Sequence, residues 1–143
     1  MTTGTQQSGA RNTAILYASV AAGAVMGGVA RYLISIIIHS GAGIPWATLF
    51  VNVTGSFIIG FYGTLSGPDG RLFTTARQRQ FVMTGFCGGY TTFSSFSLET
   101  VKLLQTNMAR TALIYVAVSI VTWLLAVWLG HALASRLNRL KGS

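Results

Sequence analysis

Apolar residues gather into four long runs along the chain, separated by charged and turn-forming residues. The runs cover residues 14–38, 46–66, 80–105 and 111–135. Arg31 interrupts the first run, and a stretch without charge from residue 80 to residue 98 opens the third. An α-helix needs about 20 residues to cross the roughly 30 Å of hydrocarbon in a bilayer. The pattern therefore predicts an all-α membrane protein with four transmembrane helices.

The segments between the runs are short, so the chain is predicted to form one four-helix transmembrane domain over residues 14–136. A Gly-Pro-Asp-Gly turn at residues 67–70 follows the second run. Residues 1–13 are polar and are expected to be a disordered tail, whereas residues 137–143 form a basic C-terminal tail. An even number of spans places both tails on the same side of the membrane.

Composition agrees with this interpretation. Only 8% of the residues are charged, whereas a soluble domain carries about 25%. The net charge is +8, and the basic residues flank the apolar runs, where they meet anionic headgroups. A lipid bilayer rather than nucleic acid is therefore the expected partner. Two acids and two histidines provide little material for acid–base catalysis or a metal cage, so an enzyme is not expected.

Polar residues recur at helical spacing inside the second and fourth runs. Thr48, Asn52 and Ser56 lie four residues apart, as do Tyr115 and Ser119. Polar groups in hydrocarbon face protein or a wet cavity, because no water reaches them otherwise. Asn52 is interpreted as a functional group, with an interhelical clamp as the alternative. For the hydroxyl residues, a helix-packing surface is an equal alternative.

The third run is the least typical of a lipid-facing helix. Residues 84–97 contain three glycines and six Ser or Thr hydroxyls. Gly88 and Gly89 predict a break in this helix, because glycine disfavours a helix interior and permits unusual torsions. Carbonyls released at such a break suit a monovalent cation. Alternatively, Gly85 and Gly89 allow a tight helix crossing, and both interpretations can hold together.

Two phenylalanines follow the predicted break. Phe93 and Phe96 share one helix face and alternate with the hydroxyls of Ser94, Ser95 and Ser97. The edge of a phenylalanine ring is electropositive, and hydroxyls donate hydrogen bonds, so the two together suit an anion that has lost its water. Packing in the protein core is the alternative for two phenylalanines at this spacing.

The third run closely resembles the signature of the Fluc, or CrcB, family of fluoride channels. The matching residues are Gly85-Phe-Cys-Gly-Gly-Tyr-Thr-Thr-Phe-Ser-Ser-Phe-Ser-Leu-Glu99. Three further segments agree in order and spacing: Gly27-Gly-Val-Ala-Arg31-Tyr, Thr48-Leu-Phe-Val-Asn52-Val-Thr-Gly-Ser56, and Tyr115 with Ser119. The resemblance extends over all four runs. Its departures are Ala47, where many relatives carry glycine, and Trp123, where some carry a small hydroxyl residue.

This resemblance implies a passive, fluoride-selective channel that exports fluoride across the inner cell membrane. It also implies two subunits in an antiparallel, dual-topology dimer, with a structural sodium ion, which is not transported, on the carbonyls of Gly88 and Thr91. Arg31 would lie in the vestibule. The implied fluoride pathway includes Asn52, Phe93, Phe96, Ser94, Ser97, Ser119 and Glu99. For Glu99, an ion pair with Lys102 or Arg110 is the structural alternative.

A proton-coupled small multidrug transporter is the alternative function, since it has four helices of similar length. That class needs a membrane-embedded carboxylate in its first span, and residues 14–38 contain none. The absence of this carboxylate disfavours a small multidrug transporter.

The basic residues are divided unequally between the two predicted sides of the membrane. Seven lie on the side of the termini and three on the other, which favours termini in the cytoplasm. A subunit that inserts in both orientations should carry nearly equal numbers of basic residues on its two sides. An antiparallel homodimer is favoured, and a heterodimer with a related chain stays open.

Overall fold

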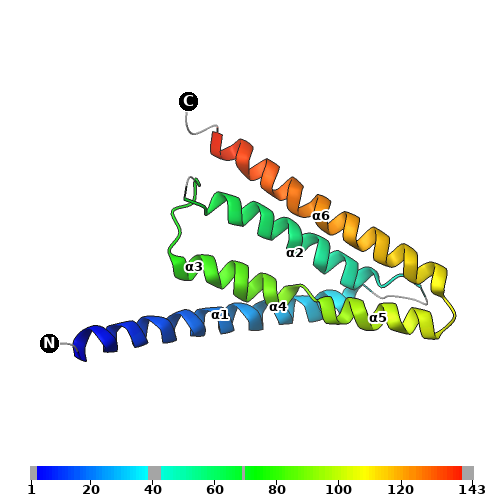
Figure 1. The fold of residues 1–143 in the computed structure, drawn as a ribbon, viewed down its shortest axis with the longest axis horizontal. Helices are drawn as coiled ribbons and strands as arrows, with labels where there is room; N and C mark the ends of the chain where they lie inside the picture. Colours follow the sequence, from blue (N-terminus) through cyan, green and yellow to red (C-terminus); the bar gives the residue numbers. More distant parts are fainter. Residues whose placement is uncertain (1–2, 39–42, 69, 140–143) are drawn as a thin grey trace.

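The structure, a computed structural model, describes residues 3–38, 43–68 and 70–139, and they are mostly helical (Figure 1). The long helices are α1 (Thr3–Ile37), α2 (Trp46–Leu65) and α6 (Ala109–Arg139). Four shorter elements form the remaining passage: α3 (Ala76–Gln80), the π-helix η1 (Phe81–Cys87), α4 (Gly88–Tyr90) and α5 (Phe93–Gln105). Successive passages run in opposite directions, so both described ends lie at one end of the bundle (Figure 1).

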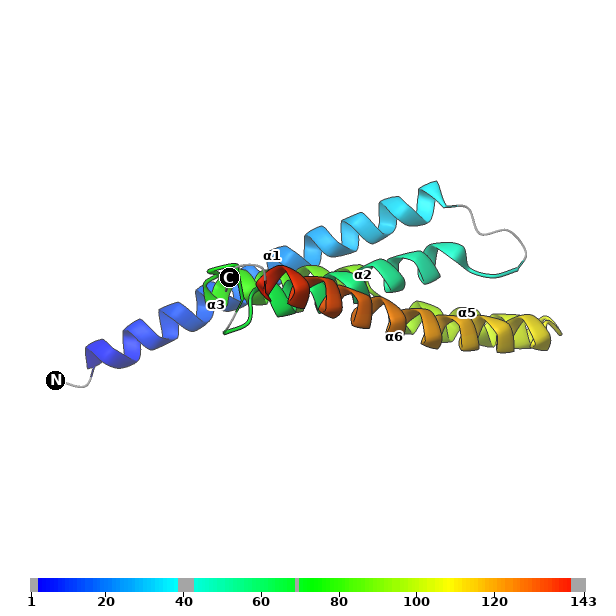
Figure 2. The ribbon, with the colours of Figure 1, turned by 90° about the horizontal axis from the view of Figure 1, so that it is seen from above.

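Three of the predicted spans are confirmed as single long helices. Within the described residues, 9–37, 46–65 and 109–139 are long and apolar enough to cross a membrane. The third run is instead a chain of short helices that continue one another: α3, η1 and α4 lie beside α1, whereas α5 diverges from it (Figure 2). The all-α prediction is confirmed, since the described part of the chain contains no strand.

The N-terminal residues differ from the predicted disordered tail. Helix α1 begins at Thr3, and its first turns extend beyond the other helices (Figure 2). No proline lies before the apolar run, so a helix nucleated in that run can propagate backwards through Gln, Ala and Arg, which are good helix formers. At the other end, α6 continues to Arg139. The remainder of the predicted basic tail lies outside the described residues.

The third run is broken, as predicted, but not at its glycines. Gly88 has the helical torsions φ −64° and ψ −35°. The extended residues are Thr91 (φ −81°, ψ 159°) and Thr92 (φ −152°, ψ 114°). The expectation that Gly88 and Gly89 supply unusual torsions is therefore wrong, because both residues belong to α4.

The glycines act instead through close packing. A Cβ atom on Gly27 of α1 or on Gly89 of α4 would overlap a backbone carbonyl oxygen of the facing helix. The same holds for Gly60 and Gly130, which lie where α2 and α6 pack together. Small residues allow such close backbone contact between membrane helices. The alternative of a tight crossing at Gly85 and Gly89 is thus the one that the structure supports.

Candidate functional site

The side chain of Asn52 binds the backbone at the helix break. Its Nδ2 donates to the Thr92 carbonyl at 3.0 Å, and the Thr92 N–H donates to its Oδ1 at 2.8 Å. Asn52 is buried in α2. One amide therefore satisfies both backbone groups of a buried, extended residue. The interhelical clamp, the alternative interpretation of Asn52, is present in the structure.

Thr92 caps the helix that follows the break. Its Oγ1 accepts a hydrogen bond from the Ser95 N–H at 3.1 Å, which begins α5. In a continuous helix the N–H of Thr92 would bond to the Gly88 carbonyl, and that of Ser95 to the Thr91 carbonyl. Both donors are directed to side chains instead. The carbonyls of Gly88 and Thr91 thus lose the donors that a regular helix would give them.

The outer side of this break is open. Gly88 is exposed, and a Cβ atom added to it would meet nothing within 4 Å. Ser94, one of the predicted pathway hydroxyls, is also exposed. The described residues contain no cluster of His, Cys, Asp or Glu that could hold a metal ion. A cation here would depend on backbone oxygens.

Glu99 joins three helices through two buried hydroxyls. Its Oε1 accepts a hydrogen bond from Thr48 Oγ1 at 2.7 Å, and its Oε2 accepts one from the Tyr115 hydroxyl at 2.8 Å. Thr48 and Tyr115 are buried in α2 and α6. Within the described part of the chain, Glu99 makes no ion pair with Lys102 or Arg110, so its hydrogen bonds to the two hydroxyls are the interactions that the structure supports.

Two cavities meet at the break. The first, of about 270 Å³, is lined by ten residues: Gly28, Arg31, Tyr32, Ser35, Ala47, Thr48, Val51, Thr92, Ser95 and Glu99. The second, of about 210 Å³, is lined by Asn52, Ser56, Ile59, Thr91, Thr92, Phe93 and Trp123. Thr92 borders both. Arg31 therefore borders one of these cavities and Asn52 borders the other.

The two phenylalanines that share a predicted helix face differ in their exposure. Phe93 is 70% exposed and borders the second cavity, whereas Phe96 is only 7% exposed. The Phe96 ring centroid lies 5.2 Å from that of Tyr115 and 4.9 Å from that of Trp123. Phe96 thus packs in the core, and its ring centroid is still 5.5 Å from that of Phe93.

The remaining predicted hydroxyls differ in their surroundings. Ser97 donates to the Phe93 carbonyl of its own helix at 3.0 Å. Ser119 is completely buried, and its Oγ has no hydrogen-bond partner among the described residues. The cap made by Thr92 was not predicted from the sequence. Its signal was a threonine three residues before Ser95 at the start of a helix, which is a capping pattern.

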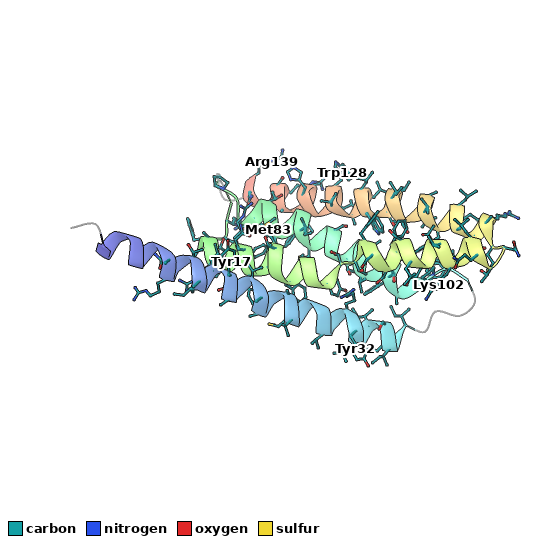
Figure 3. The ribbon with its side chains drawn as sticks, turned by 60° about the horizontal axis from the view of Figure 1, so that its bottom comes forward. Tyr17, Tyr32, Met83, Lys102, Trp128 and Arg139 are labelled. Carbon is teal, nitrogen blue, oxygen red and sulfur yellow. The ribbon has the colours of Figure 1, made fainter. Side chains whose placement is uncertain are left out.

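Large apolar side chains cover the outside of the bundle. Trp128 on α6 is 62% exposed and points away from the other helices (Figure 3), and Leu124 on the same helix is 63% exposed. A water-soluble surface rarely carries such an extended apolar area. This outer face suits lipid, whereas Thr48, Asn52, Thr92 and Ser119 are buried inside the bundle.

Replacing Asn52 by leucine is expected to destabilise the fold, because the N–H and carbonyl of Thr92 lose their partner. Each unpaired buried group costs about 1–3 kcal/mol, so the loss of a partner by two groups should lower the free energy of unfolding by about 2–6 kcal/mol. Unfolding in detergent, followed by circular dichroism, measures the change. Ser56→Ala, one turn along the same face of α2, is the matched control and should change little. Equal stability of the two variants would show that the clamp contributes nothing.

The family model described as CrcB-like protein, Camphor Resistance (CrcB), matches residues 18–131. A protein of Rhodopseudomonas palustris named Fluoride-specific ion channel FluC 1 is 65% identical over 135 residues, which cover 93% of this chain and 96% of that protein. One of Bradyrhizobium diazoefficiens with the same name is 62% identical over 131 residues, 92% of each. The chain therefore belongs to the CrcB family.

Proposed function

We propose that this chain is a subunit of a passive, fluoride-selective channel that releases fluoride from the cytoplasm across the cell membrane. The observation that carries the proposal is its 65% identity, over almost its whole length, to a relative named as a fluoride-specific ion channel. The site supports it, since two cavities lined by hydrogen-bond donors meet at Thr92. A multidrug transporter has no comparable support.

The cavities supply what a small anion needs. Fluoride is strongly hydrated, so a selective pathway must replace its water with several donors. The Arg31 guanidinium borders the first cavity, and Asn52 borders the second. An amide NH₂ carries two hydrogens, and Nδ2 of Asn52 uses one of them on the Thr92 carbonyl. The second hydrogen can serve the anion, so the clamp and the pathway roles of Asn52 are compatible.

The direction of flow follows from the membrane potential. Fluoride enters cells as the neutral weak acid and dissociates in the cytoplasm. A potential that is negative inside drives an anion outward, by about 2.3 kcal/mol per charge for each 100 mV. A passive pathway is therefore sufficient for export, and no proton-carrying side chain is required.

A second, antiparallel subunit completes the proposed channel. Gly88, Phe93 and Ser94 are exposed in the middle of a membrane passage, and a hydroxyl in that position is disfavoured against lipid. A second copy in the opposite orientation would cover this face. The unequal distribution of basic residues keeps a related partner chain as the alternative to a homodimer.

The carbonyls of Gly88 and Thr91 are the proposed ligands of a structural sodium ion. Unwound backbone carbonyls bind sodium in membrane proteins. Both carbonyls lose their helical donors, because the N–H groups of Thr92 and Ser95 bind side chains. Two ligands from each subunit would surround one ion. Its positive charge would lower the energy of an anion in a medium of low dielectric constant.

Liposomes that contain the purified chain test the proposed function. They should release loaded fluoride rapidly when the membrane potential is collapsed, and chloride at a much lower rate. A fluoride electrode outside the vesicles records the release. No release, or equal rates for the two anions, would overturn the proposal.

Phe93→Ile should lower the fluoride flux at least about tenfold, a loss of about 1.4 kcal/mol, because it removes the electropositive ring edge. The ring is 70% exposed, so the fold should remain intact. Leu98→Ile is the matched control, since Leu98 is an exposed apolar residue of the same helix. A normal flux through Phe93→Ile in the same liposome assay would exclude the ring from the pathway.

Removal of sodium should weaken the dimer. When sodium is replaced by N-methylglucamine, the protein in detergent should shift from dimer to monomer in size-exclusion chromatography, and sodium should restore the dimer. Thr91→Ser should behave like the unmodified protein, because the proposed ligand is the carbonyl. A dimer that is insensitive to sodium, or a sodium current across a bilayer, would contradict the proposal.

A further inference from the structure

A further cavity, which we call the terminal cavity, lies away from the helix break. Helix α3 provides part of its wall and lies near the end of the bundle that carries the described termini (Figure 1). Its volume of about 500 Å³ exceeds that of either cavity at Thr92. The lining residues are Ser19, Tyr62, Leu72, Phe73, Thr74, Arg77, Gln78, Phe81 and Val82. The proposed fluoride pathway uses none of them.

The terminal cavity extends across the level at which the chain passes from water into hydrocarbon. Arg77 and Gln78 precede the uncharged stretch that begins at residue 80, whereas Phe81 and Val82 lie within it. Tyr62 belongs to the last turn of α2. The cavity is therefore polar at one end and apolar at the other. A phospholipid has the same division, because its headgroup lies at the interface and its acyl chains lie in hydrocarbon.

Two neighbouring side chains at the polar end have hydrogen-bond donors that the protein does not use. Gln78 Oε1 accepts hydrogen bonds from the Thr75 N–H at 2.9 Å and from Thr75 Oγ1 at 3.2 Å. Its NH₂ group has no acceptor among the described residues, and the guanidinium of Arg77 has no hydrogen-bond or ion-pair partner there. Arginine binds phosphate oxygens through two parallel N–H groups. The pair therefore suits a phosphate group.

The charge at this end of the bundle favours an anion. Between residues 66 and 80 the sequence contains one acid, Asp69, and three arginines: Arg71, Arg77 and Arg79. The last turn of α6 adds Arg136 and Arg139 at the same end (Figure 1). Basic pockets between membrane helices bind anionic headgroups. A zwitterionic headgroup would gain less from this surplus of positive charge.

The segment that carries Leu72 and Phe73 is held at both of its ends. The Leu72 N–H donates to the Leu65 carbonyl at 2.9 Å. After the segment, Thr75 and Gln78 form a capping box at the start of α3. Phe73 is nevertheless 92% exposed, and Leu72 is 42% exposed. Apolar side chains that a fixed segment presents at the membrane interface favour contact with acyl chains.

We propose that the terminal cavity binds one anionic phospholipid, with its phosphate on Arg77 and Gln78 and an acyl chain against Phe81 and Val82. This lipid would touch α1, α2 and the third passage together, because all three contribute to the wall. It would therefore stabilise the bundle at this end. The inference concerns lipid binding and does not depend on which ion the protein conducts.

Native mass spectrometry of the whole protein, released from detergent micelles, counts the lipids that each subunit retains. The unmodified chain should retain one phosphatidylglycerol, and at least about tenfold less phosphatidylcholine at the same concentration. Arg77→Gln should lower the retention of phosphatidylglycerol at least about tenfold, since it removes a charged hydrogen-bond donor. Arg77 is exposed, so this variant should fold normally, which circular dichroism verifies.

Arg110→Gln is the matched control, because it removes the same charge from an exposed residue at the opposite end of α6. It should retain phosphatidylglycerol like the unmodified chain. Excess inorganic phosphate, added before release, should not displace the lipid, since a free anion lacks the acyl contacts. Displacement by phosphate would assign the site to a free anion and overturn the proposal. Equal retention of the two lipids, or equal retention by the two variants, would also overturn it.

Discussion

Hydrocarbon offers no hydrogen bonds to a backbone that leaves its helix, and this constraint governs the arrangement around Thr92. The amide of Asn52 supplies both missing partners from α2. This pairing attaches α2 to the third passage of the chain, allows a new helix to begin at Phe93, and leaves the carbonyls of Gly88 and Thr91 without helical donors. Thr92 also borders both of the cavities described above.

The other contacts hold this segment in place. Glu99 accepts hydrogen bonds from Thr48 of α2 and Tyr115 of α6. One turn before Glu99 in α5, the ring of Phe96 packs against the ring of Tyr115. Helix α1 can approach the third passage closely because glycines face each other there. The result is a polar interior that contains donors at fixed positions and few charges. Such an interior can replace the water of a small anion without binding the ion too tightly to release it.

Much of this fold is predictable from the sequence, because charges delimit the apolar runs and run length determines what can span a bilayer. The break in the third passage was predicted, but it was attributed to unusual torsions of Gly88 and Gly89, which are helical. Glycine allows both unusual torsions and close packing, and only the facing helix decides between them at Gly89. The pattern placed Asn52 inside but did not identify its partner, because a backbone group leaves no mark in a sequence. Likewise, the spacing of Phe93 and Phe96 predicts a shared face and not that one ring is buried and the other exposed.

The central claim, a passive pathway selective for fluoride, is tested most directly by the reversal potential of the current through a planar bilayer that contains the purified chain. The account predicts that this potential follows the fluoride gradient, by about 59 mV for each tenfold change. It also predicts no dependence on the gradients of protons, sodium or chloride. A reversal potential that follows protons or sodium would contradict the account.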